Sequence, residues 1–237
     1  MYKNYIFDLY GTLIDIHTDE NRPMLWKKLS SFFQFQGASY TPKELKRAYR
    51  SLADEALAKP SPYTYKEIQI EYIFKTLLQD KGIHPSRELL LHVCQLFRIL
   101  STDYLKLYDG AKDLLVKLKE NQKHVYLLSN AQRVFTESEM KALGIYDCFD
   151  GILFSSDSFC KKPDFAFFHH LFTSYQLDQK ESIMIGNDAT TDIKGAASYG
   201  LDSMYLHSNQ SNDLPDQELP VFLLNPIDLK KAALLLL

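Results

Sequence analysis

Short apolar runs that end in polar residues recur along this chain. The first covers residues 5–7, Tyr-Ile-Phe, and leads directly into Asp8, which predicts a buried strand with a carboxylate at its carboxyl end. The segments between the later runs have helical patterns that stop at Gly144 and Gly200, residues that suit a left-handed helix end. This alternation predicts βαβ units on a parallel sheet. The later runs are expected to form strands at 125–128, 151–154, 183–185, 203–206 and 221–224.

Residues 17–105 have a different pattern, in which helical signals follow one another without an intervening strand. We expect four helices there, which together form a small bundle. The first spans about 24–36, two begin at capping boxes that start at Thr41 and Thr64, and the last runs from Ser86 to about Ser101. Because a lone parallel strand cannot stand apart from its sheet, this segment is predicted to be an insertion after the first strand.

The predicted fold class is therefore α/β, with a Rossmann-like three-layer parallel sheet core and an inserted all-helical, four-helix domain. The core comprises residues 1–16 and 106–237, and the helical insertion comprises residues 17–105. The short apolar tail, residues 232–237, is expected to dock onto the core as a final helix.

Composition indicates where the protein works and which partners it lacks, but says little about its reaction. The chain has 237 residues and is 46% hydrophobic, enough for a sizeable core, and no apolar run approaches the roughly 18 residues of a membrane span. Its three cysteines match neither a disulfide framework nor a Cys-x-x-Cys metal site, which indicates a reducing cytoplasm. A net charge of −3 makes nucleic acid a poor candidate partner. We expect a cytoplasmic monomer or homodimer with neither a membrane nor a nucleic-acid partner.

Polar residues capable of chemistry follow several of the predicted strands. Because the carboxyl ends of parallel strands meet at one edge of the sheet, these residues are expected to gather there. Taken singly, each has an ordinary explanation as a helix cap, a surface lysine or an acid in a first helical turn. Their repetition at successive strand ends favours a functional site. The residues are Asp8 and Thr12, Ser129 and Asn130, Lys162 before Pro163 and Asp164, and Asn187 and Asp188 with Asp192 further on.

This set of side chains suits attack on a phosphate monoester. An attacking carboxylate is repelled by the ester's negative charge, so a cation is needed, and Mg²⁺ prefers a few oxygen ligands. Asp8 and Asp188 can supply two of them. Lys162 and the hydroxyls of Thr12 and Ser129 can hold the phosphate oxygens as charge builds in the transition state.

In order, these motifs resemble the four motifs of the haloacid dehalogenase superfamily, and the helical insertion is similar to that superfamily's cap. The resemblance spans nearly the whole chain and implies that Asp8 is a nucleophile that forms an aspartyl intermediate, which water hydrolyses. It also implies that Thr12, Ser129 and Lys162 bind the leaving or transferring group, and we place Asn130 with them among the catalytic residues. Asp188 would ligate the metal, and Asp192, supported by Asn187, would orient Lys162 or the metal shell.

Tyr10 departs from this pattern. Most phosphatases of the superfamily carry an aspartate there as general acid and base, whereas its dehalogenases carry tyrosine. The fourth motif points the other way, because those dehalogenases have a serine and an asparagine there, where this chain has Asn187, Asp188 and Ala189. Asp188 favours a metal, and the backbone carbonyl of Tyr10 stays available as a ligand. We therefore place Tyr10 in the site twice, with its side chain binding substrate and its carbonyl binding the metal.

The sequence thus favours a Mg²⁺-dependent phosphatase that acts on a small anionic phosphorylated metabolite, and two alternatives stay open. One is an (S)-2-haloacid dehalogenase, in which Asp8 attacks carbon without a metal. The other is a non-catalytic binding or regulatory protein with the same fold. Arg47 and Arg50 in the helical insertion, and Arg22 near its start, are candidates for binding a second anionic group of the substrate. They can equally be ordinary surface arginines.

Overall fold

Six parallel strands form the central sheet of the computed structural model, which describes residues 2–216 and 219–237. The strand order is β5-β4-β1-β6-β7-β8, so the strand that leads into Asp8 lies between β4 and β6. All predicted strands of the sheet are present, with ends that shift by a residue or so. The strands are β1 (Asn4–Phe7), β4 (His124–Ser129), β5 (Gly151–Phe154), β6 (Ser182–Gly186), β7 (Asp202–Leu206) and β8 (Phe222–Leu224).

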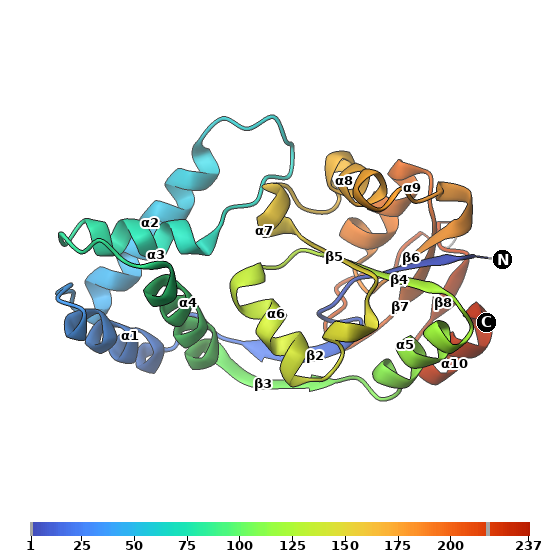
Figure 1. Cartoon of the computed structure of the whole chain (residues 1–237), viewed down its shortest axis with the longest axis horizontal. Helices are drawn as coiled ribbons and strands as arrows, with labels where there is room; N and C mark the ends of the chain where they lie inside the picture. Colours follow the sequence, from blue (N-terminus) through green and yellow to red (C-terminus); the bar gives the residue numbers. More distant parts are fainter. Residues whose placement is uncertain (1, 217–218) are drawn as a thin grey trace.

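Alternate side chains of β1 point to opposite faces of this sheet, and helices cover both faces (Figure 1). Tyr5 and Phe7 join the apolar cluster that includes helices α5 (Ala111–Glu120) and α10 (Leu229–Leu236). Ile6 joins the cluster that includes α8 (Phe165–Tyr175) and α9 (Gly195–Tyr199). The result is the predicted three-layer Rossmann-like architecture, with the tail forming helix α10. No helix among residues 2–216 and 219–237 is both long and apolar enough to cross a membrane.

The inserted segment forms four helices with an apolar core of their own. They lie at the end of the molecule opposite the two termini (Figure 1). Their core is rich in aromatic side chains, with Trp26, Phe33, Phe74 and Phe97 buried and packed edge to face. The helices are α1 (Pro23–Phe35), α2 (Pro42–Ala58), α3 (Ile70–Gln79) and α4 (Arg87–Ser101). The exact division of the chain into domains at residues 17 and 105 stays a prediction.

The capping box predicted at Thr41 is present, because its side chain accepts a hydrogen bond from the Glu44 backbone and the Glu44 carboxylate accepts one from the Thr41 backbone. The box predicted at Thr64 is wrong. Helix α3 begins six residues later, at Ile70, and the Glu67 carboxylate instead accepts a hydrogen bond from Ser155 Oγ at 2.8 Å. Tertiary partners thus override a local helix signal.

Residues 65–70 instead bind to residues 155–161 and Gln132 of the sheet-bearing part, and we call this contact the clasp. Two of its bonds join backbones: Glu67 N donates to Phe159 O at 2.9 Å, and Lys161 N donates to Tyr65 O at 2.8 Å. The side chain of Gln132 adds bonds to the backbones of Ile68 and Ile70. The clasp therefore joins the four-helix insertion to the core at a second position, which lies far along the chain from the ends of the insertion.

The expectation of helices without a strand across residues 17–105 is wrong at both margins. Strand β2 (Ile14–Thr18) runs past residue 17 and pairs antiparallel with β3 (Thr102–Leu107), which forms a two-stranded ribbon between the two parts. Most side chains of β3 are at least partly exposed, so it lacks the apolar signal of the buried strands. Its partner Asp15 is buried and accepts a hydrogen bond from Tyr104.

Candidate active site

The polar residues that follow β1, β4 and β6 meet in one cavity of about 230 Å³ at the carboxyl edge of the sheet. The predicted members Asp8, Lys162 and Asp188 face it together. Thr12 lies just behind, fully buried. The full lining is Asp8, Tyr10, Ser129, Asn130, Lys162, Asn187, Asp188, Thr191, Asp192 and Gln210.

Lys162 lies between two carboxylates at the bottom of this cavity. Its Nζ is 2.7 Å from Asp8 Oδ1 and 2.7 Å from Asp192 Oδ1, and its side chain is 1% exposed. Burial opposes the charge on Lys162, but the two carboxylates outweigh it and raise the pKa of the ammonium. Burial is also the largest effect on Asp192 and raises the pKa of that carboxyl, although Lys162 pulls it down. The ammonium is therefore a fixed positive charge beside Asp8.

The backbone of Lys162 is held as firmly as its side chain. The Asn130 amide donates from Nδ2 to the Lys162 carbonyl at 3.0 Å and accepts from the Lys162 N–H at 2.8 Å. Asn130, directly after β4, thus fixes the loop that carries the lysine. Ser129, the last residue of β4, is buried and lines the cavity.

The turn after Asp8 brings Thr12 back toward the carboxylate. Thr12 Oγ1 lies 3.2 Å from Asp8 Oδ2 and 3.1 Å from Asn187 Oδ1, so the hydroxyl links the ends of β1 and β6. Gly11 makes this turn with a φ of 85°, and a Cβ there would lie 2.4 Å from the Asn187 amide. A residue without a side chain is therefore required at position 11.

Replacing Gly11 with alanine is expected to destabilise the fold by about 1–3 kcal/mol and to displace Asn187. The positive φ strains any side chain, and the clash acts on a buried amide that holds Thr12. Chemical denaturation measures the loss, with Gly82→Ala as the matched control, because Gly82 also has a positive φ but its Cβ would meet no atom within 4 Å. Equal losses in the two variants would show that the close approach to Asn187 is irrelevant.

Asp188 and Asp192 lie four residues apart at the start of a π-helix that residues 189–194 form. The two side chains have different tasks. Asp188 Oδ1 accepts the backbone N–H groups of Thr190 and Thr191, and its Oδ2 accepts no hydrogen bond from the described residues. Asp192 Oδ2 turns back to accept the N–H groups of Asn187 and Asp188, at 3.1 and 3.0 Å. Both carboxylates line the cavity, but Asp192 is the one that holds the loop after β6 in place through hydrogen bonds to its backbone.

The donors around the cavity fit a magnesium ion. No three His, Cys, Asp or Glu side chains cluster as a closed metal cage in the described part of the chain. Mg²⁺ does not need such a cage, because it is commonly bound through one or two carboxylates together with substrate phosphate oxygens and waters. Asp8 and Asp188 line the same cavity, and one oxygen of Asp188 accepts no hydrogen bond from residues 2–216 or 219–237.

Tyr10 also lines the cavity, but its hydroxyl is engaged elsewhere. It donates a hydrogen bond to Glu139 Oε2 on helix α6 (Arg133–Ala142) and lies 3.0 Å from Thr136 Oγ1 of the same helix. Burial is the main reason that the pKa of this phenol lies well above its usual value. The hydroxyl is therefore neutral and held by α6 rather than aimed at Asp8.

The arginines proposed from the sequence do not line this cavity. Arg50 donates to the side chain of Asn21, and Arg22 pairs with Asp103 beside the β2–β3 ribbon. Arg47 is exposed on α2. Their suggested role toward a second anionic group stays a prediction.

Gln210 and Thr191 are lining residues that sequence reasoning missed. Gln210 belongs to the polar stretch after β7, and its side chain and that of Asn209 both donate to the buried Asp15. Ser211 in the same stretch donates to the Asn187 carbonyl at 2.8 Å. A polar run at a strand end was the signal used for β1, β4 and β6, so the same signal at β7 could have identified this loop.

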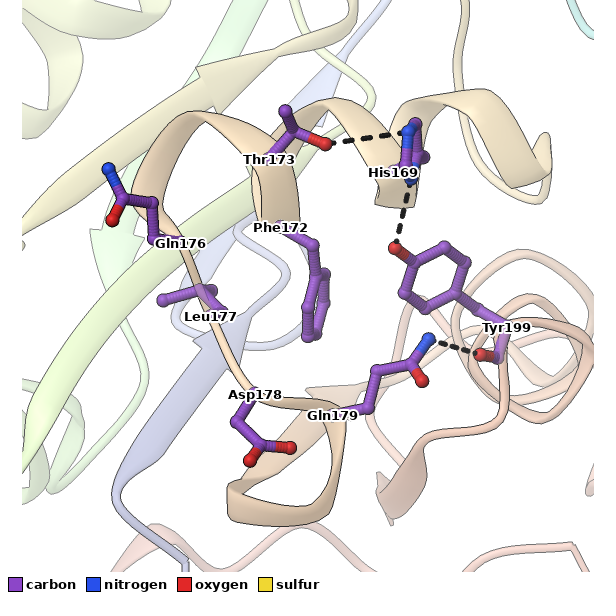
Figure 2. A pocket seen from close by; sticks show the side chains of 8 residues that line it. All are labelled: His169, Phe172, Thr173, Gln176, Leu177, Asp178, Gln179 and Tyr199. Atoms are coloured by element: carbon purple, nitrogen blue, oxygen red, sulfur yellow. Dashed lines mark hydrogen bonds between the residues drawn. The ribbon is translucent and has the colours of Figure 1, made fainter.

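A second hollow, of about 510 Å³, lies along α8 and is drawn in Figure 2. Part of its lining immediately precedes β6, at the sheet edge opposite Asp8. His169 lies between Thr173 and Tyr199, each 3.4 Å from one ring nitrogen, and Asp178 is the one carboxylate in the lining. Without a lysine, an arginine or a second acid, this lining does not match the chemistry of the first cavity.

Comparison with known proteins places the chain in context. A family described as haloacid dehalogenase-like hydrolase matches residues 2–200. The HAD-hydrolase YfnB of Bacillus subtilis is 25% identical over 91% of this chain and 88% of its own. The N-acylneuraminate-9-phosphatase of Mus musculus is 22% identical over 93% of this chain and 89% of its own.

Solved structures of two such proteins share the fold. The magnesium-bound structure of B. subtilis YfnB, described as revealing interdomain movement, has a TM-score of 0.57 at 22% identity and covers 99% of this chain and 98% of its own. The L-2-haloacid dehalogenase of Xanthobacter autotrophicus, solved with chloropropionic acid covalently bound, has a TM-score of 0.56 at 14% identity and covers 100% and 98%.

Proposed function

Because the chain belongs to the haloacid dehalogenase-like hydrolases, as its four motifs predict, we propose that it is a Mg²⁺-dependent phosphatase of a small anionic phosphorylated metabolite. The observation that carries this proposal is Asp188, which faces the same cavity as Asp8 and Lys162 and has an oxygen that no donor in the described part of the chain reaches. Asp192 is already paired with Lys162, whereas the remaining oxygen of Asp188 suits a cation that neutralises phosphate. The phosphatase named among the relatives supports the same choice.

In this proposal the Asp8 carboxylate attacks phosphorus, the bond from phosphorus to the leaving oxygen breaks, and that oxygen departs with the electron pair. Water then attacks phosphorus of the aspartyl-phosphate, which releases phosphate and restores Asp8. Lys162 stabilises the charge on the transferring group, and the Ser129 hydroxyl at the cavity wall is a further donor. The Thr12 hydroxyl lies behind the cavity and positions the Asp8 carboxylate. A magnesium ion held by Asp8, Asp188 and the Tyr10 carbonyl would supply charge neutralisation.

We further propose that the four-helix segment, residues 17–105, acts as a cap domain over this cavity. It reaches the site through Arg98 of α4, whose guanidinium lies 5.2 Å from the centre of the Tyr10 ring. The clasp and the β2–β3 ribbon connect it to the core on two other sides. A cytoplasmic monomer or homodimer is the proposed setting.

Turnover is expected to depend strongly on the leaving group. Acetyl phosphate and p-nitrophenyl phosphate should be cleaved at least roughly a hundredfold faster than an alkyl phosphate, because general acid assistance is typically worth that much and the Tyr10 hydroxyl is a poor acid held by Glu139. Tyr10→Asp should narrow the gap. Steady-state kinetics on the three esters measure it, and equal rates for the unmodified protein would contradict this account of Tyr10.

Dehalogenation is the second candidate, favoured by Tyr10 alone. In that reaction Asp8 would attack the carbon that bears the halogen and release halide, with no need for Asp188. A panel of p-nitrophenyl phosphate, acetyl phosphate and 2-chloropropionate, each with Mg²⁺ and with EDTA, separates the candidates. Magnesium-dependent phosphate release is expected; halide release in EDTA would identify a dehalogenase, and no turnover on any substrate would favour a binding or regulatory protein.

A further inference from the structure

Three side chains from three separate segments meet beside the cavity. Arg98 belongs to cap helix α4, Glu139 to core helix α6, and Tyr10 to the turn after Asp8. Arg98 Nε donates to Glu139 Oε1 at 2.5 Å and its Nη2 donates to Oε2 at 3.2 Å, while the Tyr10 hydroxyl donates to the same Oε2. One carboxylate therefore binds the cap and the catalytic turn at the same time.

Besides its ion pair with Glu139, Arg98 packs against aromatic rings. The Arg98 guanidinium lies over two rings, 5.2 Å from the centre of Tyr10 and 4.7 Å from the centre of Phe135. The side chains of Arg98 and Glu139 are only 15% and 11% exposed, so solvent screens the pair far less than a surface ion pair. Loss of one partner would leave a poorly solvated charge on the other. Cap movement that separates α4 from α6 therefore has to break both hydrogen bonds of the Arg98–Glu139 ion pair at a site with little solvent access.

Tyr10 connects the Arg98–Glu139 ion pair to the turn that follows Asp8. It lies two residues after Asp8, and its hydroxyl is held by Glu139 and Thr136. Anchoring the ring fixes the backbone between Asp8 and Thr12, including the Tyr10 carbonyl that we expect to face the metal. The phenol thus has a mechanical task in place of the proton transfer performed by an aspartate.

We propose that Tyr10, Glu139 and Arg98 form a latch that holds the cap closed against the catalytic turn, with Glu139 as the positioning residue. The effect of the latch on substrate affinity rests on the proposed phosphatase function, but its effect on the cap does not. With the latch formed, the cap and the turn after Asp8 move as one unit. With the latch broken, the cap opens more often and substrate binding weakens.

The clasp supplies a readout of opening that needs no substrate. Its backbone donors, the N–H groups of Glu67 and Lys161, bond across the boundary between cap and core, so their hydrogen exchange reports how often the two parts separate. The clasp has no side chain in common with the latch. Gln132 of the clasp is the N-cap of α6, but the backbone bonds of Glu67 and Lys161 do not involve that helix, so a change in the exchange of these two amides reports motion of the cap.

The test is hydrogen exchange, read by mass spectrometry, of the full chain and of Glu139→Gln and Tyr10→Phe. Glu139→Gln keeps the size of the side chain and removes its charge, and Tyr10→Phe keeps the ring and removes the hydroxyl. Both are expected to speed exchange of the clasp amides by about tenfold or more, with unchanged exchange in β1 and β4. Lys119→Met is the control, because it removes an ion pair with Asp150 in which both partners belong to the sheet-bearing part and neither belongs to the cap.

Kinetics on p-nitrophenyl phosphate add a second readout. Glu139→Gln, which does not line the cavity, should raise KM roughly tenfold with a smaller fall in kcat, a split expected when closure is impaired more than chemistry. Unchanged clasp exchange in both variants, or exchange that speeds equally throughout the chain, would overturn the latch. Absence of phosphatase activity in the unmodified protein would instead reject the proposed function, and the exchange result would still decide the latch.

Discussion

Replacing Asp8 with asparagine is expected to abolish phosphate release, with a fall in kcat/KM at least on the order of ten-thousandfold. The carboxylate is the proposed attacking group, it lines the cavity, and one of its oxygens lies 2.7 Å from Lys162. A carboxamide cannot form the aspartyl-phosphate. The fold should persist, because Lys162 keeps Asp192 as its counter-ion at 2.7 Å.

Steady-state kinetics with p-nitrophenyl phosphate and a thermal unfolding curve check both halves of this result. Asp109→Asn is the matched control, since Asp109 is an exposed carboxylate paired with Lys230 on the surface. That variant should keep full activity. Retained activity in Asp8→Asn, with the folding curve unchanged, would remove Asp8 as the nucleophile.

Replacing Lys162 with methionine is expected to lower the free energy of unfolding by about 3–5 kcal/mol and to remove activity as well. The ammonium is the shared counter-ion of Asp8 and Asp192, and all three groups are buried. Without it, two carboxylates remain close together in a region of low solvation. Urea denaturation at neutral pH measures the loss.

A double variant separates the electrostatic cause from a packing defect. Adding Asp192→Asn to Lys162→Met removes one of the two uncompensated charges, so much of the lost stability should return while activity stays absent. Asn130→Ala is informative beside it, because it frees the loop that carries the lysine without touching its charge. If the double variant is no more stable than Lys162→Met, the charge argument is wrong.

Much of the fold and the core of the site could be predicted from the sequence because their signals are local. Buried strands such as residues 5–7 are short apolar runs, and polar residues at their carboxyl ends must converge on one edge of a parallel sheet. Asp8, Ser129 and Asp188 follow from that rule without any knowledge of their contacts. The Thr41 capping box is equally local and is present.

What the sequence could not provide depends on partners that lie far along the chain. The Thr64 box has the same residue types as the Thr41 box, but Glu67 finds Ser155 and the segment becomes part of the clasp. The direction of the Tyr10 hydroxyl is set by Glu139, 129 residues away, and by Arg98 of the cap. The β2–β3 ribbon depends on contacts such as that of Tyr104 with the buried Asp15 rather than on an apolar pattern.

The central claim is that Asp8 carries a phosphoryl group during turnover, and chemical trapping tests it most directly. The protein is mixed with acetyl phosphate and Mg²⁺, quenched in acid, reduced with borohydride and digested. Mass spectrometry of the peptide that contains residue 8 should then show homoserine in place of aspartate, in the unmodified protein and not in a sample without acetyl phosphate. Steady turnover of acetyl phosphate with an unmodified Asp8 peptide, or with the reduced residue at another position, would contradict the claim.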